Sequence, residues 1–183
     1  MNLPAKLMLS VSFLTTISFA AMADAPLPAE VCLQPTTSNG PDAFNPVWYL
    51  HLSLIEGHKN LYTVNGFELG EKKSPVESYV DGMDGTALIA TESNMLNAKE
   101  TLHISLQGSG SDLKKDIHDM WHTDAIFDLN PASLSGNLMS ITTDTIVAAG
   151  NNPVVPVKST STRNILIKKV ACPASVAAIL EAK

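Results

Sequence analysis

The sequence is poor in basic residues and lacks the short motifs of several common protein classes. Its 183 residues include 12 Lys and Arg against 18 Asp and Glu, a formal charge of −6, and the basic residues form no cluster. A mildly acidic surface of this kind argues against binding to nucleic acid or anionic lipid. The sequence has no G-x-x-x-x-G-K or G-x-G-x-x-G phosphate loop, no G-x-S-x-G nucleophile elbow and no H-E-x-x-H zinc motif. We therefore expect no nucleic-acid partner and none of the activities that these motifs define.

Long apolar segments are also scarce, because the sequence has only one, at its start. Lys6 precedes the uncharged segment 7–21, and Ala21, Met22 and Ala23 fit the small-x-small pattern of a cleavage site. The segment is short for a membrane span and rich in Ser and Thr. Residues 1–23 are therefore predicted to be a signal peptide for export to the periplasm or beyond, the alternative being an uncleaved anchor. After cleavage we expect no integral association with a membrane.

The sequence has only two cysteines, Cys32 and Cys172, and no C-x-x-C pair. Residues 24–183 have the length of a single domain, and without Lys6 they carry 11 basic against 18 acidic residues, a formal charge of −7. Both cysteines lie in this segment, and an exported protein meets an oxidising environment. We predict a disulfide that joins the two ends of the domain, the alternative being two free thiols.

The dominant hydrophobic period between the cysteines is two, which is typical of strands. In segment 47–55, one face carries Trp48, Leu50, Leu52 and Leu54, which alternate with residues of the other face. The strands are expected at 47–55, 61–69, 78–91, 101–107, 123–130, 135–148 and 161–172, with a bend or bulge at Gly82 and Gly85, a loop at 108–112, and a short helix from Pro173 on. Because the linkers between strands are mostly short, they favour an all-β, antiparallel up-and-down meander of about seven to eight strands that closes into a barrel. The alternative is a β-sandwich.

This architecture resembles that of the calycins, the family of barrels that includes the lipocalins and avidins. The resemblance is one of pattern: lipocalins typically carry Gly-x-Trp in the first strand, whereas Trp48 follows Asn45, Pro46 and Val47. It implies a calycin-like fold and assigns no functional residues.

Segment 116–124 contains His118 and His122 among several acidic residues. In a helix these histidines would be close enough to share a metal ion, whereas in a strand they would lie about 13 Å apart. The pattern favours a helical turn up to about Ile117 followed by a strand from Asp119. In that strand, one face would carry Trp121, Thr123, Ala125, Phe127 and Leu129. We therefore predict no metal site, no catalytic residues and no cofactor.

Three hypotheses for function follow from a small exported barrel. The first is binding of a small apolar or amphipathic ligand in the lumen. Its aromatic candidates are Trp48, Tyr49, Tyr62, Phe67, Trp121 and Phe127. The alternative is a structural or protein-interaction module of the envelope or cell surface that uses the loops at 92–100 and 149–162. An enzyme, the least favoured hypothesis, would need His122 and Asp124 to converge with a residue such as His103.

Overall fold

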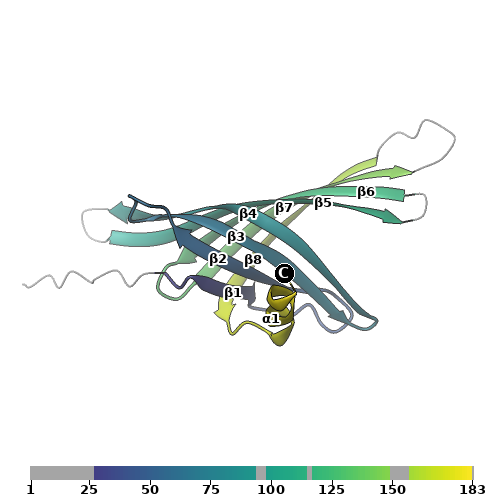
Figure 1. The fold of residues 1–183 in the computed structure, drawn as a ribbon, viewed down its shortest axis with the longest axis horizontal. Coiled ribbons are helices and arrows are strands. Elements are labelled where there is room, and N and C mark those ends of the chain that lie inside the picture. The colour runs from purple at the N-terminus through teal and green to yellow at the C-terminus, as the bar shows by residue number, and fades with distance from the viewer. Residues whose placement is uncertain (1–26, 94–97, 115–116, 149–156, 183) are drawn as a thin grey trace, which may run out of the picture.

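The computed structural model describes residues 27–93, 98–114, 117–148 and 157–182, so the predicted signal peptide lies outside the described residues. Eight antiparallel strands are followed by one helix (Figure 1). Their bounds are β1 Glu30–Pro35, β2 Asn45–Leu54, β3 Leu61–Lys73, β4 Val76–Ser93, β5 Ala98–Lys114, β6 Ile117–Asn130, β7 Ser135–Ala148, β8 Val157–Val170 and α1 Ala174–Glu181. Each strand pairs with the next, and β8 pairs with β1. The predicted closed barrel is confirmed, and the sandwich alternative is wrong because all eight described strands belong to one closed sheet.

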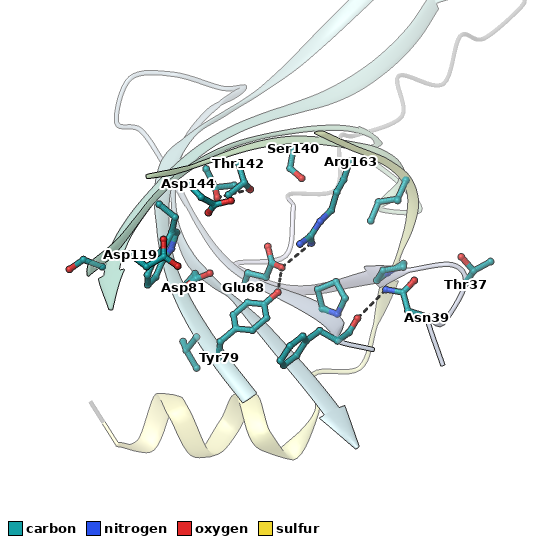
Figure 2. A pocket seen from close by; sticks show the side chains of 18 residues that line it. Thr37, Asn39, Glu68, Tyr79, Asp81, Asp119, Ser140, Thr142, Asp144 and Arg163 are labelled. Atoms are coloured by element: carbon teal, nitrogen blue, oxygen red, sulfur yellow. Dashed lines mark hydrogen bonds and ion pairs between the residues drawn. The ribbon is translucent and has the colours of Figure 1, made fainter. Parts of the chain in front are cut away.

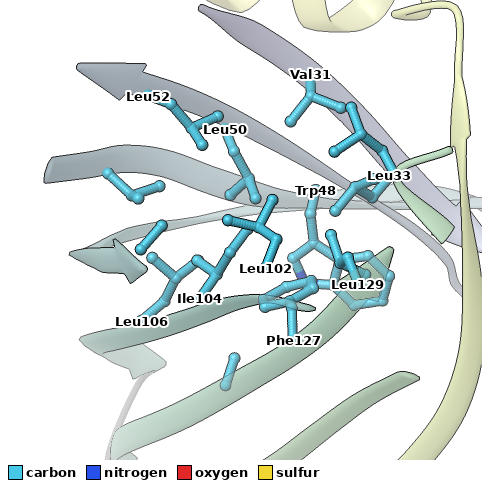
Figure 3. Packing of buried hydrophobic residues seen from close by; sticks show 14 of the residues in the cluster. Val31, Leu33, Trp48, Leu50, Leu52, Leu102, Ile104, Leu106, Phe127 and Leu129 are labelled. Atoms are coloured by element: carbon cyan, nitrogen blue, oxygen red, sulfur yellow. The ribbon is translucent and has the colours of Figure 1, made fainter. Parts of the chain in front are cut away.

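The apolar face of each strand points into the barrel and fills half of its lumen. Trp48, Leu50 and Leu52 of β2 lie in this core, as their alternation predicted. Leu54, expected on the same face, is the last residue of β2 and is 55 % exposed. Phe127 of β6 meets Trp48 edge-on, with 6.0 Å between the ring centroids (Figure 3). The other members come mainly from β1, β3, β4, β5, β7 and β8, and include Leu33, Val64, Ala87, Leu102, Ile104, Leu138 and Ile167. This half of the barrel is a packed interior.

Helix α1 covers part of the outer surface of the barrel. It begins directly after Pro173, which suits a first helical turn, and it buries Val176 in a second apolar cluster. That cluster includes Tyr49 and Phe67, whose stacked rings lie 5.3 Å apart between centroids. β2 is therefore buried on both faces, because its inner face meets the core and its outer face meets this cluster.

The Cys32–Cys172 disulfide lies at the junction where the barrel closes. β1 pairs with β8 over only four positions, from Cys32 opposite Val170 to Pro35 opposite Ile167. The predicted bridge is thus present, and it covalently supports one of the two short ladders that β1 forms, each of four positions.

Several local expectations were wrong. β1 was not expected, and it is a short strand that contains a proline. Residues 108–112, expected as a loop, belong to β5 and pair with β6, and for the same reason no helical turn spans 111–114. The register between β3 and β4 runs without interruption through Gly82 and Gly85, so there is no bulge. In each case pairing with a neighbouring strand overrides local propensity.

The ladder between β4 and β5 and the ladder between β8 and β1 both end before the longer strands do. One end of the barrel is therefore divided into two arms. β4 pairs with β5 only from Asp84 opposite Gln107 onward. We call residues 68–73 of β3 and 76–83 of β4 the hairpin arm. We call residues 108–114, 117–123, 142–148 and 157–163, from β5 to β8, the sheet arm. The two arms diverge on the right of Figure 1.

Removal of the disulfide should destabilise the barrel strongly. A Cys32→Ala/Cys172→Ala variant should lose roughly 2–5 kcal/mol of unfolding free energy, because the bridge closes a loop of 140 residues. Urea unfolding followed by circular dichroism measures the loss. Reductant should lower the midpoint of the wild type and leave that of the variant unchanged; equal midpoints for the oxidised wild type and the variant would contradict the prediction.

The close approach of β4 to the backbone of β5 depends on Gly85. A Cβ there would overlap the backbone carbonyl oxygen of Ser105 on β5, whereas a Cβ at Gly82 would have no atom within 4 Å. Gly85→Ala should therefore cost about 1–3 kcal/mol of unfolding free energy, as overpacking does. Gly82→Ala, the matched control on the same strand, should change it by no more than about 0.5 kcal/mol. Equal midpoints for the two variants in urea unfolding would show that the backbone approach at Gly85 is unimportant.

Candidate functional site

A cavity of about 800 Å³ lies between the two arms, next to the apolar half of the lumen. Its size is within the range of small-molecule sites. The hairpin arm contributes Glu68, Tyr79, Val80 and Asp81, and the sheet arm contributes Ser111, Asp119, Trp121, Thr123, Thr142, Asp144 and Arg163. Pro35, Thr37, Asn39, Phe44, Pro46, Ser140 and Ile165 complete the wall. The cavity is therefore lined largely by polar side chains, in contrast to the core.

Glu68 lies at the boundary between the core and the cavity and is only 8 % exposed. On the core side, Trp48 Nε1 donates a hydrogen bond to Glu68 Oε2 at 3.0 Å. On the cavity side, Tyr79 donates its hydroxyl to Oε1 at 2.5 Å, and Arg163 Nη1 lies 3.4 Å from the same oxygen (Figure 2). Three donors thus compensate a buried carboxylate that would otherwise be costly.

Tyr79 acts as a permanent hydrogen-bond donor in this group. Burial raises the pKa of its phenol above the ordinary value, and the negative charge of Glu68 raises that pKa further. The phenol therefore stays protonated through the physiological range, which suits a fixed donor and not a general base.

Three further carboxylates line the cavity, and they are less completely paired than Glu68. Burial raises the pKa of Asp81, and the charge of Glu68 adds to this, while a hydrogen bond from the Trp121 side chain opposes it. Asp119 has a buried Oδ1 atom for which the described residues supply no hydrogen-bond partner. Asp144 lies on the adjacent strand β7, directly opposite Trp121 in register. Figure 2 places these three groups on one side of the cavity, away from Thr37 and Asn39.

The aromatic residues proposed as ligand contacts lie in three different places. Trp121 lines the cavity, where its ring occupies the space that a side chain at Gly110 would need. Trp48, Tyr62 and Phe127 are buried in the core, and Trp48 reaches the cavity only through its hydrogen bond to Glu68. Tyr49 and Phe67 pack on the outer surface beneath α1.

The histidines of the sequence hypotheses lie outside the barrel. His122 contacts Asp124 at 3.4 Å and His103 contacts Asp128 at 2.6 Å, and all four side chains are about half exposed. The two pairs do not converge, because Asp124 pairs in register with Gln107, four residues from His103.

Within the described ranges, no three His, Cys, Asp or Glu side chains are placed to share a metal ion. His118 and His122 lie in one strand, where a spacing of four corresponds to about 13 Å.

Sequence reasoning missed Glu68, Tyr79, Asp81 and Arg163. The sequence did contain a sign that Glu68 is a functional candidate. The alternation of β3 places Glu68 on the inner face with Val64. A charge that points into a barrel needs hydrogen-bond partners. The partners themselves could not be read in this way, because Arg163 is 95 residues away and meets Glu68 only through barrel closure.

In comparisons with known proteins, no family model, curated protein or solved structure matches this chain. None of the helices in the described part of the chain has the length and apolar character needed to cross a membrane.

The raised pKa of Asp81 predicts a pH-dependent cost to stability. When the pKa of a carboxyl is higher in the folded state than in the unfolded state, its protonated form favours folding. This stabilisation is fully present at a pH below the unfolded-state pKa, and it is lost as the pH rises through the folded-state pKa. Asp81→Asn should therefore raise the melting temperature at pH 7, and the gain should vanish near pH 3.

Thermal unfolding of both proteins between pH 3 and 8 measures this difference. Asp84→Asn is the matched control, because Asp84 is exposed on the outer face of the same strand. A gain from Asp81→Asn that does not depend on pH would refute the assignment.

Proposed function

We propose that this barrel binds a small organic cation in the cavity between its arms. The observation that carries the proposal is the composition of the wall, in which four carboxylates, from Glu68, Asp81, Asp119 and Asp144, surround a cavity of about 800 Å³ that holds one guanidinium, from Arg163. Such a wall favours positive charge, and the low dielectric of a partly enclosed site strengthens the attraction.

The carboxylates differ in whether their oxygens already accept hydrogen bonds from the protein or are available to a ligand. Glu68 already accepts from Trp48, Tyr79 and Arg163, so its charge is largely compensated. Asp119 has a buried oxygen without a donor in the part of the chain that the structure describes, and leaving such an atom unpaired costs roughly 1–3 kcal/mol. An ammonium group beside Asp119 would supply the missing hydrogen bond.

Trp121 favours a cation that also has an apolar part. Its side chain hydrogen-bonds Asp81 and its ring lines the cavity, so it offers an aromatic surface next to a carboxylate. Aromatic rings attract cations and also bury apolar groups. This combination supports the amphipathic form of the ligand hypothesis over a purely apolar one.

We further infer that the protein is exported and works outside the cytoplasm. The support for this is the Cys32–Cys172 bridge, because disulfides persist in oxidising compartments. The signal-like sequence of residues 1–23 points in the same direction.

Phenethylamine and phenylacetate, which have similar shapes and opposite charges, test the proposal by isothermal titration calorimetry. We expect the amine to bind and the acid not to bind. Asp119→Asn should weaken amine binding by about 10-fold or more, since a hydrogen bond to a charged group contributes about 1.5–3 kcal/mol.

The matched control is Asp124→Asn, because Asp124 lies on the same strand with its exposed side chain paired to His122 on the outer face. It should leave the affinity unchanged. Equal binding of the amine and the acid, or equal losses in the two variants, would overturn the proposal.

A further inference from the structure

We propose that the cation is the side chain of a Lys or Arg in an extended peptide, and that this peptide adds as a strand to the open edge of β8. The inference rests on the proposed function, since it uses the same cavity for the charged group. It adds a main-chain binding surface beside the cavity and so names the class of ligand.

The first observation is that β8 has a long edge without a neighbouring strand. The ladder with β1 ends at Ile167, whereas the ladder with β7 continues to Val157. Within the part of the chain that the structure describes, residues 157–165 therefore pair on one side only. Each residue from Lys158 to Asn164 is exposed, which is unusual for seven consecutive strand positions in a closed barrel.

The backbone of this edge is oriented for pairing. Thr36 N donates to Leu166 O at 2.9 Å, so the peptide groups of Leu166 face the β1 side. Backbone groups alternate between the two sides of a strand with a period of two. The N–H and C=O groups of Asn164, Thr162, Thr160 and Lys158 therefore face the open side and can bind an added antiparallel or parallel strand.

The edge lies next to the acidic cavity. Arg163 and Ile165 of β8 line the cavity, so the odd-numbered side chains of this strand face inward. Ser159 and Ser161 share that face and are small, and Ser159 pairs in register with Asp144. A strand added beside β8 would direct alternate side chains inward across these serines. A long basic side chain could then reach the carboxylates.

Charge selects the occupant among extended chains. The cavity wall has four carboxylates against one guanidinium, so an inward Lys or Arg is attracted and an inward Glu or Asp is repelled. The edge itself has a run of Ser and Thr at 159–162 and no proline in 157–170, although prolines commonly protect open edges. A basic extended peptide therefore matches both surfaces at once.

The probe is a short blocked peptide of alternating Thr and Val residues with one central Lys, and its binding is measured by calorimetry. We expect it to bind, and we expect the same peptide with Glu in place of Lys not to bind. Methylation of the backbone nitrogens on its pairing edge should abolish binding, because the main-chain donors are lost. Equal affinity of the methylated and unmethylated peptides would overturn the strand-addition proposal.

The matched protein variants are Thr162→Pro and Thr162→Ala. Proline removes one N–H that faces the open side and leaves the bonds to β7 in place, so the barrel should fold, which a thermal melt checks. Thr162→Pro should weaken peptide binding by at least about 10-fold and leave phenethylamine binding unchanged. Thr162→Ala, which keeps the N–H, should bind both ligands as the wild type does.

Each other outcome counts against a specific claim. Equal peptide affinity in the proline and alanine variants would overturn the use of the β8 edge. Binding of phenethylamine without binding of the peptide would overturn this inference alone, whereas failure of both would also overturn the proposed function. Sedimentation that shows a dimer of the wild type and a monomer of Thr162→Pro would assign the edge to a second copy of the chain.

Discussion

The burial of the Glu68 carboxylate is the constraint on which the interior of this barrel depends. A charge in a barrel lumen is tolerated only where donors surround it, and here the donors come from both directions. Trp48 approaches from the core, and Tyr79 and Arg163 approach from the cavity. The carboxylate therefore separates the apolar part of the lumen from the polar part, and it connects β2, β3, β4 and β8 across the barrel.

The unequal lengths of the strands explain why the polar half exists. β1 has 6 residues and β4 has 18, so the strands can close into a complete barrel only over the length of the shortest one. Beyond that length the sheet divides into the hairpin arm and the sheet arm. The space between them has too few inward apolar residues to form a core, and polar side chains line it instead. The disulfide at Cys32 supports closure at β1, whose ladders to β2 and β8 span only four positions each.

The sequence predicted the barrel because the inner faces of most strands alternate cleanly with polar outer faces. It did not predict β1, because that strand is short and is buried on both faces, with Leu33 inward and Cys32 beneath α1, so no alternation appears. The Gly and Ser residues at 108–111 have low strand propensity, and only the ladder with β6 holds them extended. Trp121 was placed correctly on the face of Phe127, since both follow from a single period of two.

The site was harder to predict than the fold, because the residues with the most evident chemistry lie elsewhere. His103 and His122 pair with aspartates on the outer surface, where each pair is locally satisfied and exposed. The cavity instead depends on carboxylates that resemble any others in the sequence. Two features distinguish them. Their odd or even position in each strand turns Glu68, Asp81 and Asp119 inward, and the early end of the β4–β5 ladder leaves them facing a cavity instead of a filled core. The face of the strand on which a residue lies can be read from the sequence. The residue at which a ladder ends is set by pairing partners that are far apart in the chain. The same divergence of strands that keeps the carboxylates accessible also leaves one side of β8 without a neighbouring strand among the described residues. Charge and main-chain hydrogen bonding therefore become available to a ligand at one place.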